Sequence, residues 1–157
     1  ASHKVVVFRG VFVIISGVSD DNNYAASCFT FDPFANTFGD FPPVLLPRID
    51  FGATALGGKI YIAGGWNQGS LASVEYFDPA LEFWKNLGSL PVPRSRFAMA
   101  TFQQKLALVG GDEDKSWLCD PSLIAQGVDW CFSDQPLSSP SISSLYRSVM
   151  VPLQTFL

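Results

Sequence analysis

Short apolar segments alternate with turn signals along the chain. In the middle of the sequence, residues 53–56 and 59–63 are rich in apolar and β-branched side chains, and the Gly57-Gly58 pair between them suits a two-residue hairpin turn. Two further segments of this kind, residues 73–77 and 84–87, lie on either side of an Asp-Pro turn signal. This spacing predicts four short antiparallel strands joined by tight turns and loops.

The opening of the chain is also apolar, from residue 4 to residue 15. Arg9 and Gly10 interrupt this segment, and it is shorter than the roughly 20 apolar residues that a membrane-spanning helix requires. We therefore expect two further strands here rather than a membrane anchor.

The four-strand pattern recurs with a period of 46 residues. Pro-Arg at 47–48 returns at 93–94, and Gly-Gly at 64–65 returns at 110–111. Repeats of four short strands at this period are typical of the blades of a β-propeller. The sequence therefore predicts an all-β fold, an incomplete propeller ring of three four-stranded antiparallel blades and the start of a fourth. The predicted units are residues 4–49, 50–96 and 97–146, with the first strand of a further blade at residues 147–153.

Residues that recur at one position of every unit are expected to stabilise the fold. Phe38, Trp84 and Trp130 stand 46 residues apart, and we expect them to pack between neighbouring blades. The double glycines are expected at crowded strand ends or where the backbone needs positive φ. Arg48 and Arg94 also recur, and we expect them to hold the connection between blades, with contact to a ligand as the alternative.

The charge and the histidine content exclude several function classes. The chain carries 10 Lys+Arg against 14 Asp+Glu without a basic cluster, which argues against nucleic-acid binding. Its one histidine, His3, stands at the start of the chain, which removes most metal sites and every Ser-His or Cys-His nucleophile. We therefore expect no catalytic residue, no cofactor and no bound metal.

The cysteines indicate a cellular compartment. Cys28, Cys119 and Cys131 are odd in number and form no Cys-x-x-Cys pair. Buried thiols in a reducing compartment explain them better than one disulfide with a cysteine left over. The sequence also lacks an Asn-x-Ser/Thr sequon, so we expect a cytoplasmic location.

The connections after the second strand of each unit differ while their flanking sequences match, as recognition loops on a repeated scaffold do. Asp50 and Arg96 occupy one repeat position with opposite charges. The start of a first strand and the end of a second strand lie at the same end of a sheet, so both sets of residues are expected on one face. Trp117 also lies in such a connection, and partner contact or local packing would both suit it. The candidate partner-binding residues are Tyr24, Asp50, Trp66, Asn67, Arg96, Asp112, Glu113 and Asp114.

These repeats resemble the kelch family. Apolar residues precede a double glycine at 60–65 and at 106–111, and Phe77 precedes Asp-Pro, with Trp84 after six intervening residues. In the third unit Cys119 takes the aromatic position, and in the first unit Ser16-Gly17 replaces the double glycine. The resemblance runs from residue 4 to about residue 152 and implies a kelch-type propeller.

Within that family, the run from Pro91 to Phe97 is most similar to the animal kelch-like adaptors of cullin-type ubiquitin ligases. In those proteins an upstream dimerisation module and a helical module hold the ligase, and the propeller captures the substrate. The resemblance implies a protein-binding module without enzymatic activity, with a protein partner and no nucleic-acid or membrane partner. A carbohydrate-active enzyme such as a sugar isomerase and an actin-associated scaffold are the alternatives within the family.

Overall fold

The computed structural model describes residues 3–18, 23–111, 116–124 and 131–132. Within them the chain forms three antiparallel four-stranded sheets, and the strands of each sheet follow one another in sequence order. The first sheet contains β1 (Lys4–Phe8), β2 (Val11–Val18), β3 (Tyr24–Asp32) and β4 (Thr37–Phe41). The second contains β5 (Gly52–Leu56), β6 (Lys59–Ala63), β7 (Ser73–Asp78) and β8 (Phe83–Ser89). The third contains β9 (Ala98–Phe102), β10 (Lys105–Val109), β11 (Trp117–Cys119) and β12 (Cys131–Phe132), with the short helix α1 (Pro121–Ile124) before β12.

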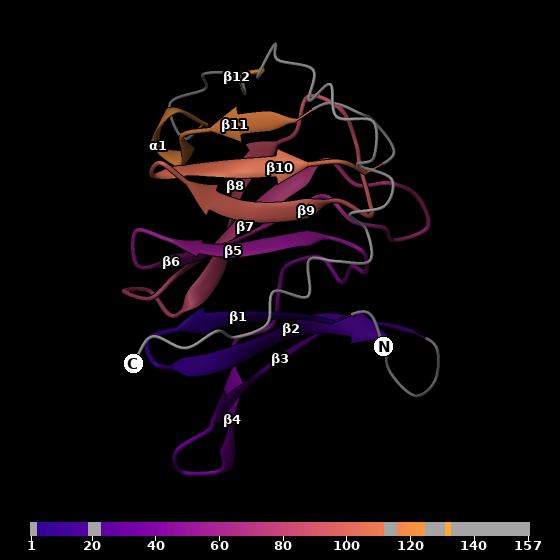
Figure 1. Ribbon diagram of the computed structural model, residues 1–157. Helices are drawn as coiled ribbons and strands as arrows, with labels where there is room; N and C mark the ends of the chain where they lie inside the picture. Colours follow the sequence, from indigo (N-terminus) through magenta and orange to yellow (C-terminus); the bar gives the residue numbers. More distant parts are fainter. Residues whose placement is uncertain (1–2, 19–22, 112–115, 125–130, 133–157) are drawn as a thin grey trace.

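The three sheets are stacked, with the first at the bottom and the third at the top of Figure 1. Their first strands lie next to one another, because β5 contacts both β1 and β9. This radial arrangement is that of propeller blades, and the described sheets do not close into a ring. The predicted all-β fold and incomplete ring are therefore confirmed. The unit boundaries stay predictions, and the strand predicted at 147–153 lies outside the described residues.

Each sheet begins with a tight hairpin. In the second sheet Gly57 and Gly58 have φ of 57° and 73°, and Leu56 pairs with Lys59 across the turn. Positive φ at both central residues gives a turn whose twist matches that of the two strands, and glycine adopts it without steric cost. The Gly57-Gly58 turn therefore sets the register of β5 against β6.

Two apolar cores lie between the sheets. Successive side chains of a strand point to opposite faces. In β6, Ile60 and Ile62 face the first sheet, whereas Tyr61 and Ala63 face the third. The second sheet is thus apolar on both faces, and a neighbouring sheet covers each of them.

Trp84 anchors the core between the first and second sheets. It is 1% exposed, and its ring packs against Phe41 and Phe77. Its indole N–H donates to the carbonyl oxygen of Pro42 at 2.9 Å, so the polar atom of the buried ring is also satisfied. The predicted packing of Trp84 between blades is confirmed.

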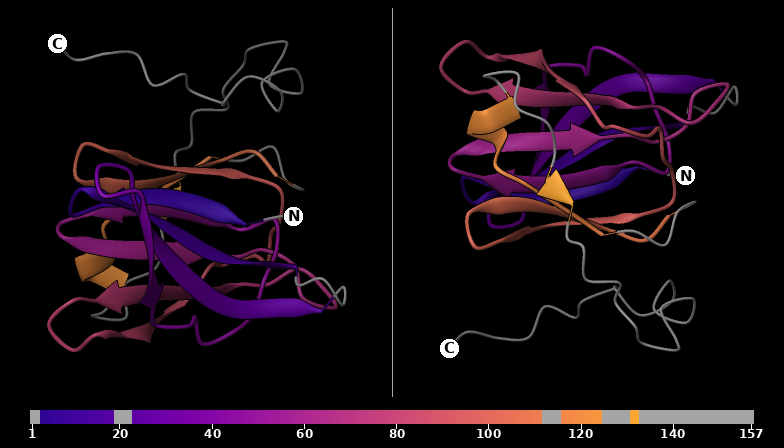
Figure 2. Two further views of the ribbon diagram at one scale, coloured as in Figure 1. Left: turned by 90° about the horizontal axis from the view of Figure 1, so that it is seen from below. Right: turned by 90° about the horizontal axis from the view of Figure 1, so that it is seen from above.

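The prediction of burial is wrong for Phe38. This residue pairs with Phe31 in the first sheet as Trp84 pairs with Phe77 in the second, yet it is 73% exposed. The physical reason is that no described sheet covers this face of the first sheet, which Figure 2 shows from below in its left view. Trp130, the third aromatic residue of the period, lies outside the described residues.

The double glycine at 64–65 sits at a crowded strand end, as predicted. Its residues have φ of 57° and 100°. A Cβ on Gly64 would lie 2.5 Å from the carbonyl oxygen of Arg94, and one on Gly65 would lie 2.6 Å from that of Ile49. Both distances are too short for a side chain, so this pair lets the connections between blades approach the second strand.

In the described part of the chain, no helix is long and apolar enough to cross a membrane.

We predict that Trp84→Ala lowers the free energy of unfolding by about 3 to 5 kcal/mol, because it leaves a cavity in the core between two sheets. Trp66→Ala should cost clearly less, since Trp66 is 41% exposed. Chemical denaturation of both variants at one protein concentration measures the difference. Equal losses would contradict the assignment of Trp84 to the interface between blades.

Candidate functional site

The connection between the first and second sheets is held by a buried ion pair. The side chain of Arg48 is fully buried and forms a salt bridge with Glu75 of β7, whose side chain is 2% exposed. The Arg48 guanidinium also donates to the carbonyl oxygens of Gly64 at 2.8 Å and Ser73 at 3.0 Å. Burial lowers the pKa of Arg48, and the charge and hydrogen bond of Glu75 act in the opposite direction. These contacts support the structural role expected for Arg48.

Glu75 also binds the segment that connects the first sheet to the second. Its two carboxylate oxygens accept the backbone N–H groups of Leu45 and Leu46 at 2.8 and 3.2 Å. The sequence analysis did not single out Glu75. An acidic residue between Val74 and Tyr76, in the middle of a predicted strand, was the available signal, because such a charge is buried only with a partner.

Arg94 holds the next connection in a different way. It is 1% exposed, and its guanidinium lies 5.1 Å from the ring centroid of Trp117 and 5.7 Å from that of Phe97. By register Trp117 occupies the position of Glu75, since Trp117 pairs with Leu108 as Glu75 pairs with Ile62. The position that carries Glu75 in the second sheet therefore carries an aromatic ring in cation–π contact with Arg94 in the third.

The partner-contact alternative for Trp117 is therefore wrong. Trp117 is 1% exposed and belongs to β11 rather than to a variable loop. The connection from Gly111 to Asp120 is four residues shorter than its counterpart in the second unit, so β11 begins sooner than the repeat suggests.

In the first unit a serine, Ser16, occupies the crowded position that Gly64 occupies in the second. Ser16, in the left-handed conformation at φ 51°, ends the regular pairing of β2 where Gly64 ends β6. Its hydroxyl accepts the N–H of Arg48 at 3.1 Å, and the carbonyl oxygens of Ala25 and Arg48 lie within donating distance at 2.6 and 2.9 Å. A side chain is tolerated there because its hydroxyl binds the connection that passes over it.

Asp50 and Arg96 lie side by side at the end of the sheets that carries these connections. The Arg96 Nε is 3.6 Å from a carboxylate oxygen of Asp50, and the Arg96 N–H donates to the Asp50 carbonyl oxygen at 2.8 Å. Both residues are left-handed, with φ of 53° and 59°. The Arg96 side chain is 72% exposed and that of Asp50 is 33% exposed. The structure thus presents opposite charges together in contact with solvent.

Trp66 and Asn67 are next to this pair. Trp66 exchanges two backbone hydrogen bonds with Ile49, the residue before Asp50, and its side chain is 41% exposed. Asn67 is half-buried, and its side-chain amide donates to the carbonyl oxygen of Pro47 at 2.9 Å, so part of its polarity serves the loop itself. An exposed aromatic residue is therefore bonded through its backbone to the neighbour of Asp50.

Of the remaining candidate residues, the structure describes only Tyr24. Tyr24 is half-buried and begins β3, opposite Val18 at the loop-bearing end of the first sheet. Asp112, Glu113 and Asp114 lie outside the described residues.

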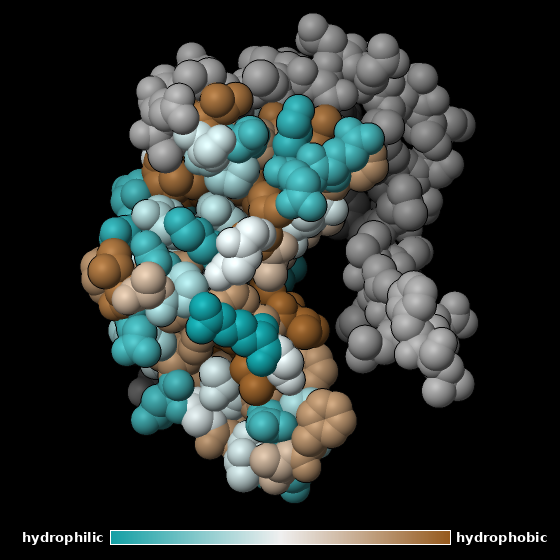
Figure 3. Space-filling model, turned by 90° about the vertical axis from the view of Figure 1, so that its left-hand side faces the viewer, coloured by the Kyte–Doolittle hydropathy of each residue, from teal (hydrophilic) through white to brown (hydrophobic). Residues whose placement is uncertain are grey.

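Lys59 and Lys105 lie at the opposite end of the sheets, beside the hairpin turns. Each follows a turn between the first and second strands of its sheet, and the Lys59 ammonium is 4.8 Å from the ring centroid of Tyr76. Figure 3 looks onto this end, where hydrophilic and hydrophobic residues are interspersed.

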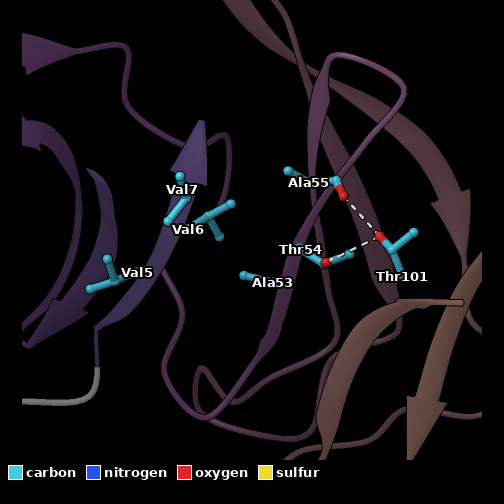
Figure 4. Close-up of a pocket in the computed structure, with 7 residues that line it drawn as sticks. All are labelled: Val5, Val6, Val7, Ala53, Thr54, Ala55 and Thr101. Carbon is cyan, nitrogen blue, oxygen red and sulfur yellow. Dashed lines mark hydrogen bonds between the residues drawn. The ribbon is translucent and has the colours of Figure 1, made fainter. Parts of the chain in front are cut away.

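A groove that the sequence analysis did not predict lies between the first strands of the sheets. Its volume is about 330 Å³, and small or β-branched residues line it. The Thr101 hydroxyl donates to the carbonyl oxygen of Ala55 at 2.8 Å and lies 3.3 Å from the hydroxyl of Thr54 (Figure 4). None of the residues that line the groove has an ionisable side chain. They are Val5, Val6, Val7, Ala53, Thr54, Ala55 and Thr101.

The described titratable residues do not form a reactive cluster. No group of three or more His, Cys, Asp or Glu residues within the described ranges is arranged to hold a metal ion. Burial raises the pKa of the Cys28 thiol, which disfavours the reactive thiolate. Hydrogen bonds from the side chain and backbone of Ser122 lower the pKa of the exposed Asp120.

A family model described as "Kelch motif" matches residues 47–91, which include all four strands of the second sheet. This chain belongs to the kelch motif family. The match agrees with the resemblance found in the sequence and with the structure of the blade.

Among curated proteins, several kelch proteins are distant relatives. Kelch-like protein 26 of Danio rerio is 36% identical over 115 residues, which cover 69% of this chain and 19% of the relative. An F-box/kelch-repeat protein of Arabidopsis thaliana is 30% identical over 113 residues, covering 69% of this chain and 30% of the relative. Human Kelch-like protein 33 is 30% identical over 113 residues, covering 69% of this chain and 21% of the relative. The chain thus spans about a fifth to a third of the length of these relatives.

We predict that Glu75→Ala lowers the free energy of unfolding by about 3 to 5 kcal/mol, because it leaves the buried charge of Arg48 without its ionic partner. Glu82→Ala is the matched control: Glu82 is exposed, and its change should stay within about 0.5 kcal/mol. Denaturant unfolding measures both values. The double variant Arg48→Met, Glu75→Leu should recover part of the loss, since no charge remains buried. A double variant less stable than Glu75→Ala would contradict this account.

Proposed function

We propose that this chain is a non-catalytic protein-binding module that contacts its partner through the loop-bearing end of its blades. The observation that carries the proposal is the exposed pair of Asp50 and Arg96. These residues recur at one position of the repeat with opposite charges and lie 3.6 Å apart, and Trp66 forms a backbone bridge with Ile49, the residue before Asp50. Aromatic residues and arginine are enriched at the energetic centres of protein interfaces.

The pair contributes little to folding, which leaves it available for binding. An exposed ion pair gains about 0 to 1 kcal/mol, in contrast to the buried pair of Arg48 and Glu75. A partner segment carrying both charges could form charge-assisted hydrogen bonds with Asp50 and Arg96 at once, each worth about 1.5 to 3 kcal/mol. We therefore propose a partner segment of mixed charge.

The finer proposal is substrate recognition for a cullin-type ubiquitin ligase. It rests on the likeness to kelch-like and F-box/kelch proteins and on the Pro-Val-Pro-Arg-Ser-Arg-Phe run at 91–97. The ligase would be reached through modules that this sequence does not contain. The buried side chains of Cys28 and Cys119 support a reducing compartment, the cytoplasm, as the place of action.

We predict that Asp50→Asn and Arg96→Gln each weaken partner capture while the melting temperature changes by no more than about 1 to 2 °C, since a surface pair adds little stability. Asparagine suits Asp50 because it tolerates the left-handed backbone. Affinity purification of the tagged chain from cells, followed by quantitative mass spectrometry, measures the loss.

Lys59→Gln and Lys105→Gln are the controls, because they also remove single charges but at the opposite end of the sheets. They should leave the captured proteins unchanged. The binding face is wrongly assigned if these controls abolish capture and the variants at Asp50 and Arg96 do not. The ligase proposal has its own readout: a cullin should co-purify with the longest form of the protein, and its absence would refute that proposal alone.

A further inference from the structure

The outermost strand of the first sheet, β4, has a free edge. It pairs with β3 through five consecutive residue pairs, and no described strand lies on its other side. No backbone hydrogen bond joins Thr37–Phe41 to another described segment, and all of these residues except Phe41 are exposed. The N–H and C=O groups of a strand point to both sides within the plane of the sheet. One side of β4 therefore presents unpaired donors and acceptors to solvent.

This free edge does not depend on what lies against the faces of the sheet. A stacked sheet covers a face, whereas the backbone groups of an outer strand lie in the plane of their own sheet. In the second sheet, neighbouring sheets cover both faces, and β8 is still an edge strand. The edge of β4 is therefore open whether or not another sheet lies on the exposed face of the first sheet.

The other edge strands that the structure describes are protected. The pairing of β8 with β7 shifts register between Val74 and Glu75, β8 carries Lys85, and α1 contacts it. Register shifts, lysines and covering elements are the devices that keep sheet edges from pairing. The first strands lie against one another around β5, and β12 is only two residues long. In contrast, the pairing of β4 has no register shift, and Thr37–Phe41 includes neither lysine nor proline.

Asp40 gives this edge a negative charge. It is exposed, and it forms no ion pair with another described residue. It shares a face of β4 with Phe38, because side chains two residues apart in a strand point to the same face. Opposite charges on neighbouring strands stabilise their pairing, and like charges destabilise it. A strand added to β4 is therefore favoured when it places a lysine or an arginine opposite Asp40.

We propose that the free edge of β4 binds an extended segment of a protein partner, which adds a fifth strand to the first sheet and places a basic side chain opposite Asp40. The backbone groups of Thr37–Phe41 select an extended segment, since main-chain hydrogen bonds along an edge require a strand. A second copy of β4 suits this edge less well, because Asp40 is the only charged residue of the strand. The site is distinct from the one proposed at Asp50 and Arg96.

The probe is a heptapeptide of alternating lysine and valine with blocked ends, titrated into the isotope-labelled 157-residue chain. Backbone amide hydrogen exchange, measured by NMR, reports where it binds. We expect alternate amides within Thr37–Phe41 to become protected, because only every second N–H points to the free edge. The amides of β8 should exchange as before. The same peptide with methylated backbone nitrogens is the control probe: it keeps the charge but donates no backbone hydrogen bond, and it should protect nothing.

Asp40→Lys tests the role of the charge. It should weaken binding of the lysine-valine peptide at least about twofold, and it should strengthen binding of a glutamate-valine peptide, since the cross-strand charge is reversed. Glu82→Lys is the matched control: Glu82 is exposed in the turn before β8, and both affinities should stay unchanged. Circular dichroism checks that the variants remain folded, and Asp40→Asn replaces Asp40→Lys if that variant unfolds.

Three results would overturn the proposal. One is that no amide of Thr37–Phe41 is protected at the highest soluble concentration of the peptide. Another is that β8 is protected as strongly as β4, or that the methylated peptide binds as well as the unmethylated one. The third is a dimer of the free chain that the peptide separates, because two β4 strands would then pair with each other.

Discussion

The three described sheets are apolar on both faces, and that constraint governs the rest of the structure. A neighbour that covers each side stabilises such a sheet, since apolar burial is the main favourable contribution to folding. The second sheet meets the condition, with Ile60 and Ile62 in one core and Tyr61 and Ala63 in the other. The first and third sheets meet it on one side only. The exposure of Phe38 and Phe102 follows from this difference in position.

One recurring residue, a buried arginine, lies at each described connection between sheets. Arg48 and Arg94 enter the fold at the same place, where the chain passes from one sheet to the next. Glu75 neutralises the first through an ion pair, whereas Trp117 meets the second with its ring. The recurring arginine position keeps both connections fixed while the neighbouring loops vary in sequence.

Buried and solvent-exposed residues alternate along these connections. Arg48 and Arg94 are buried, and two residues later Asp50 and Arg96 reach solvent. The left-handed backbone at both later positions turns the chain into the first strand of the next blade and leaves the side chain outside the core. One short segment therefore holds the blade and presents a charged side chain to solvent.

The sequence alone determined the strands of the second sheet, its hairpin turn, the 46-residue period and the crowded Gly64-Gly65 pair, because these depend on local patterns and on backbone geometry. The register of the repeat also led correctly to Trp84 as a core residue and to Arg48 as a structural one. Only the tertiary structure decided that Phe38 is exposed and that Trp117 is buried, and it alone paired Glu75 with Arg48. Burial and ion pairing depend on which sheet lies opposite a side chain. That neighbour is set by the stacking of segments distant in sequence, which no local pattern records.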